Sequence, residues 1–314
     1  MAASTKQRPL PPASSLPPES RDHLRGFLDY LQAECGLSLN TRRAYRRDLC
    51  RFLGQLGPAG GDLAKLTTRH VEQFLRACRQ EGLAVSSIAR GLAAVRMFCR
   101  YLVLQRVLAR DVSAVVESPK KWHRLPTVLD DEHVGRLLAA PDDGQDVHAL
   151  RDRAVLTVLY ATGMRASELT GLDVHDVNFR LGVVRVLGKG AKERIVPIAE
   201  SALEAVHAYL TGPRRTLASD PPSGRVFLSR SGRGLLREDV YRIVRKYVRR
   251  AALRGNVTPH TLRHAFATQL LARGADLRSV QEMLGHADIS STQVYTHVDA
   301  ARLKAIHKKF HPRG

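Results

Sequence analysis

The most informative stretch of the chain is residues 258–297, TPHTLRHAFATQLLARGADLRSVQEMLGHADISSTQVYTH. Thr258-Pro259 predicts a helix start, because a Thr side chain can cap a first turn and Pro suits its geometry. Gly274 and Gly285 predict the ends of two helices. The stretch also gathers groups that could act on a phosphate, namely His260, Arg263, His286, Tyr295 and His297.

The charge balance predicts a polyanionic partner. The 314 residues include 50 Lys and Arg against 30 Asp and Glu, a formal net charge of +20. This excess is more than solubility needs and favours nucleic acid over a membrane surface. No apolar run approaches the roughly 18 residues of a membrane-spanning helix, so we expect no membrane partner.

The N-terminus and the cysteines indicate a cytoplasmic protein. Residues 1–19 are rich in Pro and Ser and lack an apolar core, which predicts a flexible leader rather than a signal peptide. The chain contains no CxxC motif and only four cysteines, which we expect to be reduced thiols in helix cores: Cys35, Cys50, Cys78 and Cys99.

Apolar spacing divides the chain into a helical domain over 20–110, a linker over 111–126 and a mixed domain over 127–314. Helices are predicted in the first domain at 20–35, 40–56, 68–81 and 86–106. In the second they are predicted at 130–140, 146–162, 166–171, 200–211, 236–253 and 299–310. Residues 183–198 alternate in polarity and break at Gly188-Lys189-Gly190, which predicts an antiparallel hairpin.

Two basic stretches are candidates for DNA contact. The helix over 40–56 carries like charges four residues apart, which repel in an isolated helix and so suggest a polyanion opposite them. For any single residue, a solvent-exposed basic face with no ligand is an alternative to contact with a polyanion. The linker could also contact backbone phosphates. The candidates are Arg42, Arg43, Arg46, Arg47, Lys120, Lys121 and Arg124.

Cutting and rejoining a phosphodiester without a metal requires fixed cations, a nucleophile and a proton donor. Arg165 follows Gly163 at a helix start, where the helix dipole does not favour a cation, so the position suggests a role. Lys189 lies at the hairpin tip, although alone it would be an ordinary exposed lysine. Tyr295 alone would be a half-buried core residue.

Together these residues resemble the tyrosine recombinase (phage integrase) family, and within it the Xer branch. The resemblance rests on Arg165, on G-K-G-x-K-E-R from Gly188, on H-x-L-R-H from His260, on L-G-H ending at His286, and on V-Y-T-H around Tyr295. It implies a mostly α protein, with a SAM-like helical core-binding domain and a mixed α+β catalytic domain carrying a small antiparallel sheet.

The resemblance also implies a role for each matched residue. Tyr295 would attack the scissile phosphate and form a 3′-phosphotyrosine, while Arg165 and Arg263 bind its non-bridging oxygens. Lys189 would protonate the leaving 5′-oxygen, His260 would assist proton transfer, and His286 would hydrogen-bond the phosphate. Glu168 resembles the acid that supports the first arginine. Lys192 and His297 remain competitors for the lysine and histidine roles.

The partners implied are double-stranded DNA, a homologous XerC-like sister recombinase in a heterotetramer, and an FtsK-like DNA translocase. The expected activity is site-specific recombination that resolves chromosome dimers at a dif-like site, with no cofactor and no metal. The helix over 299–310, with Leu303, Ile306 and Phe310 on one stripe, could pack on its own domain or link neighbouring subunits.

Three alternatives remain. The chain could be an integrase of a mobile element, a DNA-binding protein without chemistry, or, with less support, a type IB topoisomerase. His260 and His264 are spaced like a zinc pair, but the sequence between them lacks the Glu of H-E-x-x-H, and Arg263 would repel a cation.

Overall fold

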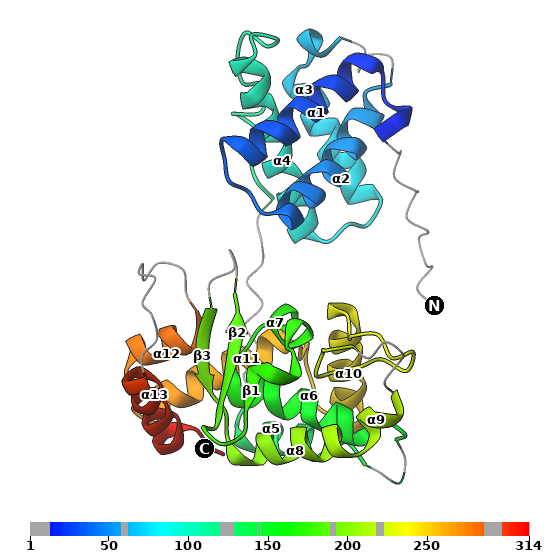
Figure 1. Ribbon diagram of the computed structural model, residues 1–314. Helices are drawn as coiled ribbons and strands as arrows, with labels where there is room; N and C mark the ends of the chain where they lie inside the picture. The colour runs from blue at the N-terminus through cyan, green and yellow to red at the C-terminus, as the bar shows by residue number, and fades with distance from the viewer. Residues whose placement is uncertain are drawn as a thin grey trace. The chain divides into compact units, whose positions relative to one another are not determined.

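A computed structural model describes the chain over residues 13–57, 62–119, 129–142, 144, 146–188, 193–217, 223–285 and 297–313, except for the side chains of 297–300 (Figure 1). It separates into two compact units, Met1–Arg124 and Leu125–Gly314. Among the described helices, none combines the length and the apolar character needed to cross a bilayer.

Unit 1 is a four-helix domain built around a central apolar helix. Its helices are α1 (Pro18–Ala33), α2 (Leu39–Gln55), α3 (Thr68–Gln80) and α4 (Val85–Leu104). Helix α4 packs against the other three. Aromatic side chains fill the contacts, with Phe27 against Phe98 and Phe52 against Phe74 in edge-to-face pairs.

The ends of unit 1 extend its core. Leu16, within the predicted leader, is buried, and α1 begins at Pro18. Val116, within the predicted linker, is also buried, and Arg96 donates a hydrogen bond to its carbonyl oxygen. The remainder of the linker, residues 120–126, lies outside the described residues.

The cysteines are free thiols in this unit. Cys50, Cys78 and Cys99 are buried, and Cys35 is partly exposed. Burial raises the pKa of Cys78 to about 11 and that of Cys99 to about 12. Both thiols are therefore protonated near neutral pH and serve as apolar core residues.

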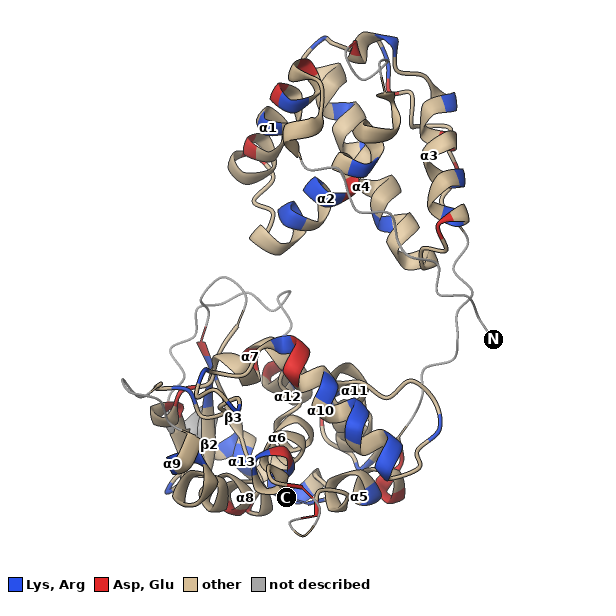
Figure 2. Cartoon of the chain, turned by 90° about the vertical axis from the view of Figure 1, so that its right-hand side faces the viewer, with Lys and Arg blue, Asp and Glu red and all other residues tan. Residues whose placement is uncertain are grey.

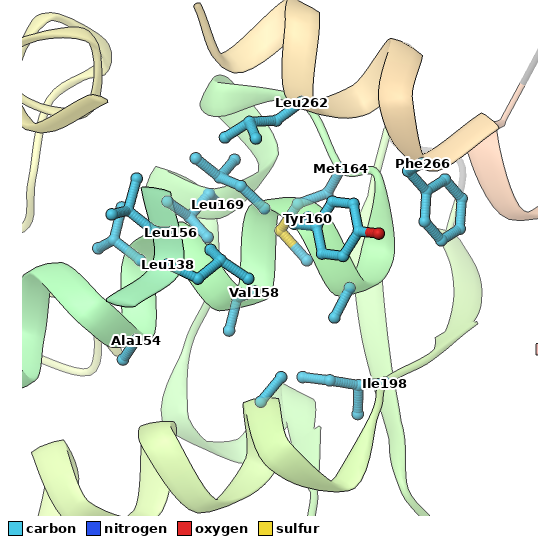
Figure 3. Close-up of a cluster of buried hydrophobic side chains, with 14 of the residues drawn as sticks. Leu138, Ala154, Leu156, Val158, Tyr160, Met164, Leu169, Ile198, Leu262 and Phe266 are labelled. Atoms are coloured by element: carbon cyan, nitrogen blue, oxygen red, sulfur yellow. The ribbon is translucent and has the colours of Figure 1, made fainter. Parts of the chain in front are cut away.

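Unit 2 surrounds one buried helix, α6 (Ala149–Thr162), whose side chains are buried at nearly every position. A helix that is apolar all round must be covered on every side. Figure 3 shows Leu156, Val158 and Tyr160 of α6 beneath side chains of α11 (Pro259–Ala272). The further helices are α5 (Asp131–Ala139), α7 (Ala166–Gly171), α8 (Glu200–Thr211), α9 (Pro213–Leu217), α10 (Arg237–Arg250), α12 (Leu277–Leu284) and α13 (His297–Phe310).

A three-stranded antiparallel sheet forms one side of unit 2. Strands β1 (Val177–Asn178), β2 (Val183–Leu187) and β3 (Glu193–Pro197) lie in that order. The predicted hairpin is β2–β3, closed by the pair Leu187 and Glu193. The fold class predicted from the sequence, mostly α with a small antiparallel sheet, is confirmed. The short elements β1 and α9 were not predicted.

Helix α13 packs on its own unit. It contacts β3, α11 and α12. Leu303 is fully buried, and Ile306 and Phe310 pack against the core of unit 2. The apolar stripe predicted from the sequence is therefore used within the subunit, and docking on a neighbour stays a prediction.

Candidate active site

A left-handed turn places Arg165. Helix α6 ends at Gly163, whose φ of 59° lies in the region that only glycine adopts readily. A Cβ there would also come within 2.4 Å of the Phe266 ring. The chain then passes through the buried Met164 to Arg165, which takes the extended N-cap conformation before α7.

Glu168 resolves the conflict of a cation at a helix start. The Arg165 backbone N–H donates to its Oε2 at 2.7 Å, and Arg165 Nη1 donates to its Oε1 at 2.9 Å. The carboxylate thus supplies the negative charge that the first turn of α7 favours. It also holds the Arg165 side chain, which is 45% exposed and can reach a ligand.

Arg263 is buried on α11 and holds two backbone carbonyls. Its Nη1 donates to the Gly163 oxygen at 2.8 Å and its Nη2 to the Leu284 oxygen at 2.7 Å. Burial, followed by the positive charge of Arg165, lowers the pKa of Arg263 to about 10. It stays charged at neutral pH, so two guanidiniums repel each other across this site, and a bound anion would relieve that repulsion.

His260 lies exposed in the first turn of α11, where the Thr258 side chain accepts a hydrogen bond from the Thr261 N–H. His264, one turn further on, is also exposed. Among the described residues, the cluster of three possible metal ligands comprises Asp173, His175 and Asp176 and includes neither of these histidines.

The remaining predicted groups flank the described elements. Helix α12 ends at Leu284 with Gly285 in a left-handed C-cap of φ 65°, directly before His286. Strands β2 and β3 bracket the loop that carries Lys189. Seven of the predicted site residues lie outside the described ranges, namely Lys120, Lys121, Arg124, Lys189, Lys192, His286 and Tyr295. The side chain of His297 is likewise not described.

The sequence did not single out Arg194, which the structure places at the centre of this cluster. It is 5% exposed on β3 and makes a two-pronged ion pair with Glu168. This ion pair affects the pKa of Glu168. Burial tends to raise that pKa, but the hydrogen bonds and charge of Arg194, together with the Arg165 N–H, hold it below its usual value. The sequence feature that could have pointed to Arg194 is its position as the last residue of the motif G-K-G-x-K-E-R.

The predicted basic face of α2 is present in unit 1. Arg43, Arg46 and Arg47 are exposed, and within the described part of the chain none of them forms an ion pair. Arg42 is partly buried and donates to the Gln32 side chain. Three of the four predicted arginines are thus free to meet a polyanion.

A second basic helix, α10, was not predicted to have a functional role. Figure 2 shows blue segments, which mark Lys and Arg positions, along the length of the helix. Arg237, Arg242, Arg245 and Arg249 are exposed. A cavity of about 440 Å³ beside the helix is lined by several cations, including Arg230, Arg233, Arg242 and Lys246.

Comparison with known proteins places the chain in a family. Residues 127–302 match the Phage integrase family, and residues 24–106 match the Phage integrase N-terminal SAM-like domain. The chain therefore belongs to the phage integrase family, the tyrosine recombinases, which are DNA strand-transferring enzymes.

Within this family the chain is most like proteins named tyrosine recombinase XerD. That of Halalkalibacterium halodurans is 43% identical over 93% of this chain and 98% of its own length. That of Shewanella oneidensis is 44% identical over 92% of this chain and 96% of its own. The resemblance to the Xer branch drawn from the motifs is confirmed.

Solved structures share the fold. A Tn1549 transposon integrase in complex with circular intermediate DNA has a TM-score of 0.68 and 18% identity, covering 90% of this chain and 98% of its own. The XerH recombinase bound to its difH substrate has a TM-score of 0.64 and 22% identity, covering 92% of this chain and 82% of its own.

Proposed function

We propose that this recombinase cuts and rejoins double-stranded DNA through Tyr295. The phenol oxygen attacks the scissile phosphorus and forms the 3′-phosphotyrosine, and the bond to the 5′-oxygen breaks. Lys189 gives its proton to that leaving oxygen. His260 assists removal of the phenol proton, and His286 hydrogen-bonds the phosphate. A free 5′-hydroxyl then attacks the phosphotyrosine, which re-forms the phosphodiester bond and releases Tyr295.

The observation that carries this proposal is the convergence of Arg165 and Arg263. Arg263 Nη2 lies 2.7 Å from the Leu284 oxygen, and Arg165 Nη1 lies 3.5 Å from the same atom. Two guanidiniums from α11 and from the start of α7 thus meet beside the turn that leads to His286. Arginines suit this place because each presents several N–H donors to phosphate oxygens and stays charged.

DNA binding would draw on both units. The arginines of α2 that are exposed, and Arg245 and Arg249 of α10, offer cations to backbone phosphates. On α10, Arg242 and Lys246 already form ion pairs with Asp239 and Asp146. Contacts of cations with DNA neutralise backbone phosphates and supply affinity that depends on salt. The predicted contacts of Lys120, Lys121 and Arg124 would add to these where the chain passes between the units.

The likeness to XerD proteins supports a specific cellular task. We propose that the enzyme resolves chromosome dimers at a dif-like site in the cytoplasm, with an XerC-like sister recombinase and under an FtsK-like translocase. Strand exchange would proceed in two steps through a Holliday junction. Helix α13 would leave its own unit or extend its contacts to link subunits.

A plasmid with two directly repeated dif-like sites tests this task. With the sister recombinase present, we expect two product circles from one substrate circle. An enzyme that instead joins one dif-like site to an unrelated mobile-element end, and leaves the repeated sites intact, would favour the integrase alternative.

A further inference from the structure

Arg194 joins three elements of unit 2 that lie far apart in the sequence. Its Nη1 and Nη2 donate to the two oxygens of Glu168 at 3.0 and 2.8 Å, and its Nε donates to the Met283 oxygen at 2.9 Å. A single side chain on β3 therefore connects the start of α7 with the end of α12.

These contacts use every nitrogen of the guanidinium. Arg194 is buried, with its side chain 6% exposed, whereas the Arg165 side chain is 45% exposed. With Nε, Nη1 and Nη2 all donating to protein oxygens, Arg194 is poorly placed to bind DNA phosphate directly. By contrast, Arg165 and Arg263 each keep at least one nitrogen that has no acceptor among the described residues. The effect of Arg194 must pass through the groups that it holds.

The first of these groups is Arg165, reached through Glu168. Each Glu168 oxygen accepts one hydrogen bond from Arg194 and one from Arg165. A carboxylate buried without a cation would favour its neutral form, which carries a proton on one oxygen and cannot accept all four bonds. Arg194 therefore keeps Glu168 able to hold the Arg165 backbone and side chain together.

The second group is the turn before His286. The last carbonyls of a helix have no partner within it, and Arg194 takes the one at Met283 while Arg263 takes the one at Leu284. A Cβ on Gly285 would lie 3.0 Å from Arg194 Cδ, so the left-handed turn is packed directly against this side chain. Arg194 therefore supports both the end of α12 and the left-handed turn at Gly285.

We infer that Arg194 is a positioning residue, which sets Arg165 through Glu168 and sets the turn that carries His286, without contacting DNA. The inference rests on the proposed roles of Arg165 and His286 at the scissile phosphate.

Arg194→Lys is the first test, because Lys keeps the charge but has one nitrogen and cannot bridge Glu168 and Met283 in this way. We expect DNA affinity within about threefold of wild type. We expect single-turnover formation of the covalent adduct on a nicked suicide duplex to fall about 10- to 100-fold, as small displacements of reacting groups can cause. Arg185→Lys is the control on the neighbouring strand, since Arg185 lies on β2 and pairs with Asp176 and Glu193 rather than with Glu168.

A double-mutant cycle separates positioning from general stability. If Arg194 acts through Arg165, Arg194→Lys should cost much less in an Arg165→Lys background than in wild type. A purely structural role would give the same fractional loss in both. Should Arg194→Lys fail to fold, Glu168→Asp shortens the same link from its other end, with the same expected loss and the same coupling to Arg165.

The results distinguish the inference from the proposed function. Without any adduct from the wild type, the proposed chemistry fails. With a wild-type adduct, wild-type rates for Arg194→Lys, or for Glu168→Asp where Arg194→Lys does not fold, would overturn the positioning role. Losses that multiply independently with that of Arg165→Lys would overturn the route through Glu168 to Arg165.

Discussion

Arg263 donates a hydrogen bond from Nη2 to the Leu284 carbonyl oxygen at 2.7 Å, so a buried cation of α11 holds the end of α12. The same guanidinium donates a hydrogen bond from Nη1 to the carbonyl oxygen of Gly163, two residues before Arg165. Two segments of the proposed phosphate site, at Gly163 and at Leu284, are thus tied to one side chain.

Arg165→Lys should cut cleavage strongly and leave folding intact. The Arg165 side chain is half exposed, and its Nη1 contact with Glu168 can be made in part by an ammonium group. Lys loses the two-pronged grip on phosphate oxygens, and the loss of a transition-state donor typically costs about 100-fold or more. Single-turnover adduct formation measures the effect, and unchanged rates would remove Arg165 from the chemistry.

Replacing Arg43, Arg46 and Arg47 with Gln should weaken DNA binding and its salt dependence. Each phosphate contact contributes about 0.9 to the slope of log affinity against log salt, so three lost contacts should lower the slope by about 2 to 3. Titrations at several salt concentrations measure this. Arg25→Gln, which removes an exposed arginine paired with Asp22 on α1, is the control. An unchanged slope in the triple variant would leave α2 as a solvated face.

Leu303→Ala should destabilise unit 2 even in the monomer. Leu303 is fully buried against its own unit, and comparable core truncations cost about 2 to 5 kcal/mol. The exposed Lys308→Ala should change the free energy of unfolding by less than about 0.5 kcal/mol. Denaturant unfolding of the isolated chain measures both. If Leu303→Ala leaves the free energy of unfolding unchanged, α13 does not pack on its own unit in solution.

Acid should loosen the C-terminal end of α13. His307 is buried and lies with Nε2 2.8 Å from the Ala161 oxygen, and His311 stacks on it at 4.5 Å between ring centroids. Burial, and next the charge of a protonated His307, lowers the pKa of His311 to about 3, while burial lowers that of His307. Arg273 and Arg313 add positive charge nearby, and Tyr160 of α6 faces the same ring.

The sign of this pH effect follows from the lowered pKa values. Both rings are neutral when folded, so their stabilisation is complete above the ordinary histidine pKa of about 6.5 and is lost as pH falls toward 3. Each ring contributes at most about 1.4 kcal/mol per pH unit. His311→Phe should therefore flatten the fall in melting temperature between pH 7 and 5, whereas the exposed His207→Gln should not. Equal slopes in all three proteins would contradict the account.

Local sequence signals predicted most elements, because they depend on neighbours in the chain. The Thr258 cap, the Gly285 stop and the β2–β3 hairpin follow from capping and turn chemistry alone. The role of Arg194 could not be predicted in this way, since its partners lie 26 and 89 residues away. The apolar stripe of α13 likewise predicted burial but not which surface would cover it.

Tyr295→Phe on a nicked suicide duplex that carries a dif-like site tests the central claim most directly. The wild-type protein should form a denaturation-resistant protein–DNA adduct, with the DNA attached to the peptide that contains Tyr295. The variant should bind the duplex with nearly unchanged affinity and form no adduct, because Phe lacks the attacking oxygen. An adduct from the variant, or a wild-type adduct on another residue, would contradict the account.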